Sequence, residues 1–174
     1  MGGTRRTPQS PHASGRNVKS ALRRPPLVVR LIATAFGAGY SPIAPGTAGS
    51  AVAVVILWLV PFSRVGLIVY FVAVTLVGTW AAHVFEKAQA TKDPGAIVVD
   101  EVSGMTLSVL LLPLTVPVLL MGFVLFRIFD VVKPFPANRL QALPGGVGVM
   151  VDDVIAGFYA LVVLLAARAV VGWP

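Results

Sequence analysis

The sequence contains no cysteine, and only two of its 174 residues are histidine. The missing thiols exclude disulfides, thiolate metal sites and a cysteine nucleophile. The two histidines, His12 and His83, offer too few nitrogen ligands for a zinc site. Charge is also scarce, since 12% of the residues are charged against about 25% in an average soluble domain. With 56% hydrophobic residues and a mean hydropathy of +0.85, the composition predicts an integral membrane protein.

The positive charge is concentrated at the N-terminus. The net charge is +7, and seven of the 14 Lys and Arg residues lie in 1–30, which leaves seven cations beside all seven acids in 31–174. This segment also holds four prolines and lacks the compact apolar region of a signal peptide. We predict a disordered cytoplasmic arm at 1–30 that contacts anionic lipid and no nucleic acid. A single membrane-embedded domain is predicted at 31–174.

Four long uncharged segments rich in Val, Leu, Ala and Ile follow the arm. They span 48–62, 65–82, 104–126 and 154–167. Because they are longer than ordinary buried strands, the predicted fold class is all-α, a membrane-embedded helical bundle. The third segment contains "LLPLTVP", in which Pro113 and Pro117 remove backbone donors and disfavour helix just before them. We therefore predict two half-helices in a re-entrant hairpin that returns both flanks to one side of the membrane.

Five of the seven acids lie in or beside apolar sequence, where an unpaired carboxylate is costly. They occur in "IVVDEVSGM", "FRIFDVVKPFP" and "VGVMVDDVIAG" and are Asp100, Glu101, Asp130, Asp152 and Asp153. Oxygen ligands of this kind suit a hard cation, and Mg²⁺ is the best candidate. Adjacent helical residues point about 100° apart. One acid of each adjacent pair is therefore expected to be a ligand and the other its supporting partner, unless the helix begins there.

Purely structural interpretations of single acids stay open. Asp152 could cap the N-terminus of the last helix after "PGGVGVM", and Arg127 with Asp130 could form an i,i+3 ion pair. The remaining acids, Glu86 and Asp93, are expected to be solvated.

Two cations and one polar loop accompany the five acids. Arg127 and Lys133 flank Asp130, and cations beside carboxylates are what a phosphate dianion needs; for Lys133, a simple preference of cations for the cytoplasmic side is the alternative. The loop "SPIAPGTAGS" interrupts an uncharged run at 31–63 just before a helix. Its hydroxyls and glycine amides could bind a phosphate, and a plain turn is the alternative.

Four stretches, "FGAGYSPIAPGTAGS", "IVVDEVSGM", "FVLFRIFDVVKPFP" and "GGVGVMVDDVIAG", resemble the phosphatidylglycerophosphatase A family in their order and spacing. The resemblance implies a Mg²⁺-dependent enzyme of the bacterial membrane, spanning it several times. Such an enzyme removes the terminal phosphomonoester of phosphatidylglycerophosphate at the cytoplasmic face and gives phosphatidylglycerol. It also implies catalytic and metal-binding roles for Asp100, Glu101, Asp130, Asp152 and Asp153, and substrate-binding roles for Ser41, Gly46, Thr47, Arg127 and Lys133.

A small transporter or ion-binding membrane protein is the alternative function, because buried carboxylates and proline-broken hairpins also occur in such proteins. The sequence lacks the "DxDGT", "PSGH" and "DGxxAR" signatures, which excludes other lipid phosphatase designs and a CDP-alcohol phosphotransferase. The oligomeric state, the number of metal ions and the attacking group stay open.

Overall fold

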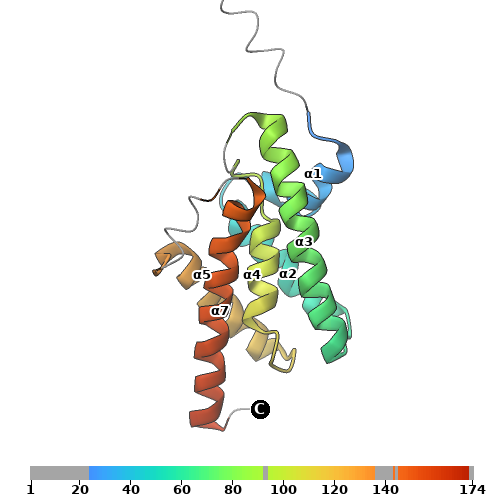
Figure 1. The fold of residues 1–174 in the computed structure, drawn as a ribbon. Coiled ribbons are helices and arrows are strands. Elements are labelled where there is room, and N and C mark those ends of the chain that lie inside the picture. Colours follow the sequence, from blue (N-terminus) through green and yellow to red (C-terminus); the bar gives the residue numbers. More distant parts are fainter. Residues whose placement is uncertain (1–23, 92–93, 136–142, 144, 173–174) are drawn as a thin grey trace, which may run out of the picture.

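The computed structural model describes residues 24–91, 94–135, 143 and 145–172 (Figure 1). Across these residues the chain is all-helical, as predicted, and contains no strand. The elements are α1 (Leu27–Ala33), the 3₁₀ helix η1 (Ala38–Tyr40), α2 (Pro45–Leu59), α3 (Arg64–Gln89), α4 (Val99–Ser108), α5 (Val116–Val132) and α7 (Gly146–Val171). Residues 1–23 of the predicted arm, and Asp93, lie outside the described residues.

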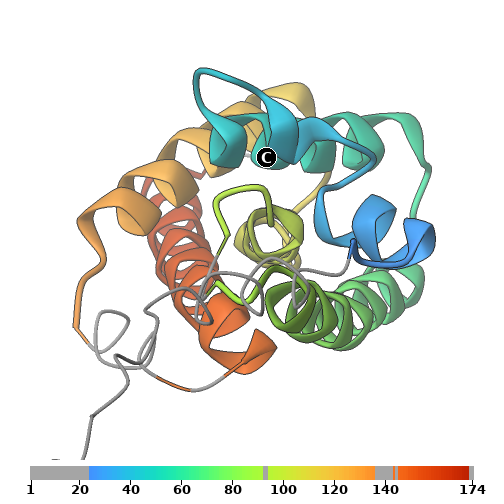
Figure 2. The same cartoon turned by 90° about the horizontal axis from the view of Figure 1, so that it is seen from above.

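The short helix α4 forms the centre of the bundle. It packs against α7, α2, α3 and α5, and the view along the bundle shows it inside the ring of the other helices (Figure 2). Met105 of α4 and Val109 directly after it are completely buried, together with Phe126 of α5 and Ala160 of α7. A charged side chain at the start of α4 is therefore close to several other helices.

The predicted segment 104–126 consists of two helices, so the expected break is confirmed. α5 begins one residue before Pro117, which places the missing N–H in the first helical turn, where no carbonyl acceptor is available. In Figure 1, α4 descends to the turn that joins it to α5 in the lower part of the bundle, and α5 runs obliquely back upward from there. Asp100 and Glu101 in the first turn of α4 and Asp130 in the last turn of α5 therefore lie at the same end of the molecule.

Two helices begin earlier than the uncharged segments indicated. α2 begins at Pro45, so that "PGT" is its first turn, and α7 begins at Gly146. Asp152 lies in the second turn of α7, and its interpretation as a helix cap is wrong. The cap is Gly145, with a φ of 66° that glycine adopts readily. The predicted segment began only after the charged residues Asp152 and Asp153. Asp152 forms an ion pair with Lys133, and a charge compensated in this way can lie inside a helix.

The surface of the bundle is largely apolar. α3 and α7, of 26 residues each, are long and apolar enough to cross a membrane by length and composition. Only 22% of the most apolar window of α3, and 28% of that of α7, is buried inside the molecule. Large apolar side chains are also exposed on the other helices, including Trp58 of α2 and Val124 of α5. An exposed apolar surface of this extent favours membrane embedding.

Candidate active site

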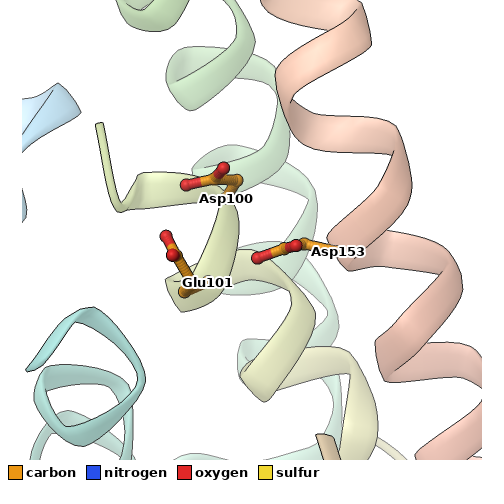
Figure 3. A group of neighbouring side chains, drawn as sticks. All are labelled: Asp100, Glu101 and Asp153. Carbon is orange, nitrogen blue, oxygen red and sulfur yellow. The ribbon is translucent and has the colours of Figure 1, made fainter. Parts of the chain in front are cut away.

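Three carboxylates meet at one end of the bundle, and we call them the acidic cluster: Asp100, Glu101 and Asp153. The first two lie in the first turn of α4 and the third in the second turn of α7 (Figure 3). One carboxylate oxygen of each residue lies within 4.8 Å of those of the other two. Asp100 and Glu101 were expected to be able to bind the same ion only if their helix begins beside them. α4 begins at Val99, so both acids can bind one ion.

Two glycines bring α4 and α7 close enough for this arrangement. A Cβ added to Gly104 would lie 2.5 Å from the carbonyl oxygen of Asp153, and one added to Gly157 would lie 2.2 Å from the carbonyl oxygen of Gly104. Any larger residue would push the two helices apart. Gly104 lies four residues after Asp100, and Gly157 lies four residues after Asp153. Each glycine therefore lies on the same helix face as an acid of the cluster. The sequence analysis missed these glycines, although this repeated spacing was a signal for them.

Several carboxylate oxygens at this end are buried without a hydrogen-bond donor. Asp152 and Asp153 are 6% and 3% exposed. Within the described part of the chain, Oε2 of Glu101, Oδ1 of Asp152 and Oδ2 of Asp153 are buried and accept no hydrogen bond. Buried carboxylate oxygens of this kind are costly unless a cation compensates them. An all-oxygen donor set with unpaired oxygens fits a hard divalent cation such as Mg²⁺.

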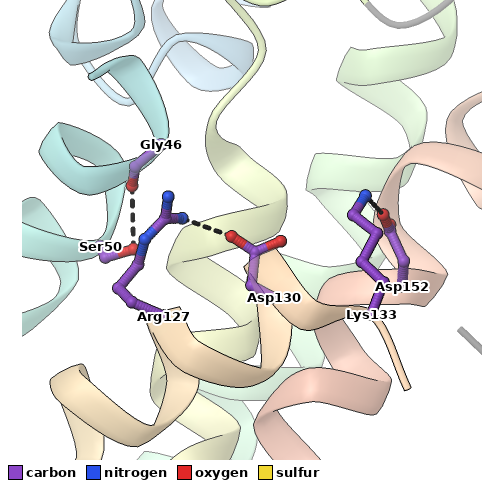
Figure 4. A network of polar contacts seen from close by, with 6 residues as sticks. All are labelled: Gly46, Ser50, Arg127, Asp130, Lys133 and Asp152. Atoms are coloured by element: carbon purple, nitrogen blue, oxygen red, sulfur yellow. Dashed lines mark hydrogen bonds and ion pairs between the residues drawn. The ribbon is translucent and has the colours of Figure 1, made fainter. Parts of the chain in front are cut away.

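The other two predicted acids form ion pairs with the two predicted cations. Nη1 of Arg127 donates to Oδ2 of Asp130, and Nζ of Lys133 donates to Oδ2 of Asp152, each at 2.5 Å (Figure 4). The i,i+3 pair on α5 that the sequence left open is therefore present. Both pairs lie at the same end of the bundle as the acidic cluster, and the structure divides the five acids into three clustered and two paired residues.

Lys133 is a cation held at the C-terminal end of α5. Burial alone would lower the pKa of Lys133. The hydrogen bond to Asp152 and the charges of Asp152, Asp130 and Asp153 outweigh burial, so the pKa lies above its usual range. The side chain is 33% exposed. Lys133 is therefore both charged at neutral pH and accessible to an anion.

The start of α2 forms a further wall of the site. A Cβ added to Gly46 would lie 2.3 Å from Oε1 of Glu101 and 2.9 Å from Nη1 of Arg127, so only glycine fits without displacing these side chains. The hydroxyl of Ser50, which is completely buried, donates to the carbonyl oxygen of Gly46 at 2.9 Å (Figure 4). Ser50 is the last residue of the loop "SPIAPGTAGS", but the sequence analysis gave it no individual role.

Backbone donors are available at the same helix end. Pro45 has no N–H, and the N–H of Ala48 already donates to the carbonyl of the N-cap residue. The N–H groups of Gly46 and Thr47 are therefore first-turn donors with no acceptor inside the helix. Ser41 lies further away along the chain, directly after η1. Among the described residues, neither the Ser41 nor the Thr47 hydroxyl hydrogen-bonds to a charged side chain of the site.

Glu86 corrects one expectation of the sequence analysis. It was expected to be solvated, but it is 8% exposed. α3 continues to Gln89, beyond the predicted end of the segment, and Glu86 lies one turn after the buried Ala82 on the same face. Burial of this face places Glu86 in the interior, outside the acidic cluster.

The sequence matches a known family over most of its length. The family described as phosphatidylglycerophosphatase A matches residues 31–168. No solved structure matches the chain.

Individual bacterial proteins are also similar to this chain. A Bacteroides thetaiotaomicron protein with the provisional name phosphatidylinositol-3-phosphatase is 40% identical over 163 residues, covering 87% of this chain and 100% of that protein. Phosphatidylglycerophosphatase A of Escherichia coli is 39% identical over 132 residues, covering 73% of this chain and 76% of its own. The Haemophilus influenzae protein of the same name is 36% identical over 145 residues, covering 80% and 88%.

Proposed function

This chain belongs to the phosphatidylglycerophosphatase A family and is a phosphatase, and we propose that it hydrolyses the terminal phosphomonoester of phosphatidylglycerophosphate. The products are phosphatidylglycerol and inorganic phosphate. The observation that carries the proposal is the position of two cations, Arg127 and Lys133, at the same bundle end as the acidic cluster. Family membership also decides against the transporter alternative.

The acidic cluster would hold Mg²⁺ through carboxylate oxygens of Asp100, Glu101 and Asp153. When bound, the ion neutralises phosphate oxygens and favours deprotonation of the attacking water. Unpaired oxygens of Glu101 and Asp153 support this assignment, because they lie in a buried environment where a cation would offset their cost.

The cations and the start of α2 would bind the phosphate group. Arg127 and Lys133 offer charged donors to its oxygens, and the N–H groups of Gly46 and Thr47 offer neutral ones. Asp130 and Asp152 hold the two cations in place by ion pairs, and for these two acids we prefer this role to direct metal binding. Phosphoryl transfer depends chiefly on such positioning and charge stabilisation.

The charged end of the bundle would face the cytoplasm, with the chain crossing the bacterial membrane several times. The basic segment 1–30 supports this orientation, because cytoplasmic segments carry an excess of Lys and Arg. A lipid substrate could then keep its acyl chains in the bilayer while its phosphate reaches the acidic cluster.

Phosphate release by the purified protein tests the proposal. In detergent micelles containing phosphatidylglycerophosphate and Mg²⁺, the wild type should release inorganic phosphate, and EDTA should abolish release until Mg²⁺ is restored. Asp153→Asn should strongly lower or abolish release at the same Mg²⁺ concentration, while Glu86→Gln, which alters a buried acid outside the acidic cluster, should retain it. No release by a folded wild-type protein would overturn the proposal.

Metal binding and substrate choice need separate measurements. Titration with Mn²⁺, followed by electron paramagnetic resonance, should show a site that Asp153→Asn weakens and Glu86→Gln preserves. Phosphatidylinositol 3-phosphate should be compared with phosphatidylglycerophosphate, because one relative carries the former activity in its name. A higher kcat/KM for phosphatidylinositol 3-phosphate would contradict the proposed substrate.

A further inference from the structure

Helix α5 and its C-cap residue carry the two predicted phosphate-binding cations, Arg127 and Lys133, and the helix lies between two neighbouring helices. Arg127 extends to the start of α2, where it lies beside Gly46, and Lys133 reaches Asp152 of α7 (Figure 4). The α2–α5 seam and the α5–α7 seam therefore each have one cation at their charged end.

An apolar groove of about 250 Å³ continues the α2–α5 seam away from Arg127. All its lining side chains are apolar, with Val55 and Trp58 on α2 and Leu119 and Leu120 on α5 among them. Leu119 is 1% exposed and forms the floor, while Val55 and Leu120 are 50% and 56% exposed at the rim. At 1.5 Å per residue, Trp58 lies about 18 Å along α2 from Gly46. The groove thus covers the depth that an acyl chain below the phosphate site would occupy.

A second apolar groove, of about 390 Å³, continues the α5–α7 seam away from Lys133. Val124 of α5 and Val163 and Leu164 of α7 are among its lining residues, which are again all apolar. Leu164 is 1% exposed, whereas Val163 at the rim is 39% exposed. Val163 lies about 15 Å along α7 from Asp153. The two grooves therefore flank α5 at similar depths.

We propose that the two acyl chains of the substrate straddle α5, one in each groove, while its phosphate lies between Arg127 and Lys133. The inference rests on the proposed function, because a lipid substrate supplies the chains. The occupant follows from continuity: each groove extends a seam whose charged end holds a phosphate-binding cation, and a diacyl lipid joins one phosphate-bearing headgroup to two chains. Burial of the chains against α5 contributes binding free energy and orients the headgroup.

A third apolar groove provides an internal control. It is the largest of the three, at about 470 Å³. Its lining residues come from α1, the turn after α1, α2, α3 and α4, and they include Val77 of α3 and Val102 of α4. No residue of α5 or α7 lines it, so it does not continue either seam that carries a cation. A substitution there changes the apolar surface without touching the proposed path of the chains.

Three matched substitutions separate the grooves. Val55→Trp fills the α2–α5 groove, Val163→Trp fills the α5–α7 groove, and Val77→Trp fills the control groove. The measurement is kcat/KM for dipalmitoyl phosphatidylglycerophosphate in mixed micelles, divided by kcat/KM for the soluble dibutyryl substrate. We expect Val55→Trp and Val163→Trp each to lower this ratio about tenfold, because a displaced chain loses contact along several methylene groups. Val77→Trp should leave the ratio unchanged.

The possible results have distinct meanings. An unchanged ratio in Val55→Trp or in Val163→Trp overturns the assignment of a chain to that groove. A similar fall in Val77→Trp overturns the proposal, since it shows a general effect of an added tryptophan on the enzyme in micelles. Failure of the proposed function gives a different result, because the wild type would then release phosphate from neither substrate.

Discussion

Gly157 lies directly against the backbone of Gly104, since a Cβ at Gly157 would be 2.2 Å from the Gly104 carbonyl oxygen. This contact joins α7 to α4 one turn beyond the acids that they contribute. It therefore sets the distance between Asp153 and the two acids of α4.

Gly157→Ala should separate α4 from α7 and disturb the acidic cluster. Overpacking of this kind costs about 1–3 kcal/mol of the free energy of unfolding. We expect a lower Tm in detergent and weaker Mn²⁺ binding. Gly95→Ala is the control, because a Cβ there meets nothing within 4 Å. Unaltered Tm and Mn²⁺ affinity in Gly157→Ala would show that the helix contact does not control the cluster.

Gly46→Ala should impair the site with a smaller effect on the fold. The new methyl group would displace Glu101 and Arg127, both of which are side chains that can move. We expect kcat/KM to fall by a factor of roughly ten or more, with Tm little changed. Gly66→Ala, in the first turn of α3, is the matched control, where the nearest atom is the Ser63 hydroxyl. Equal losses of activity in both variants would contradict a specific role of Gly46.

Asp152→Asn and Asp153→Asn should affect different ligands, although the two residues are adjacent. Asp152 holds Lys133, so its substitution should raise KM for the lipid roughly three- to tenfold. Asp153 belongs to the acidic cluster, so its substitution should raise the Mg²⁺ concentration needed for half-maximal activity, or abolish activity. If Asp152→Asn instead raises the Mg²⁺ requirement with KM for the lipid unchanged, Asp152 is a metal ligand, as the sequence analysis predicted.

The proposed topology can be tested with single cysteines, because the natural chain has none. Cysteines at Ala90 and Leu140 should react with an impermeant thiol reagent from the same side of the membrane, although Leu140 lies outside the described residues. A cysteine at Ser63, at the opposite end of α3 from Ala90, should react from the other side. Opposite-side labelling of Ala90→Cys and Leu140→Cys would exclude the re-entrant hairpin.

Much of the fold could be predicted because it depends on local properties of the chain. Long apolar runs indicated helices, and Pro113 and Pro117 indicated the break between α4 and α5 through their missing donors. Helix boundaries were less predictable. α7 continues through Asp152 and Asp153, where Lys133 pairs with the first of these two charges, and α3 buries Glu86 because it shares a helix face with the buried Ala82.

The sequence by itself determined the helical class, the broken hairpin and the small set of acids and cations available for chemistry, because these follow from composition and local backbone preferences. Only the tertiary structure decided how those acids are divided. Asp153 joins α4 in the acidic cluster while its neighbour Asp152 turns to Lys133, and Gly46 lies against Glu101. These relationships depend on distances between helices that are far apart in the chain, and close backbone contacts such as that of Gly104 with Gly157 set those distances.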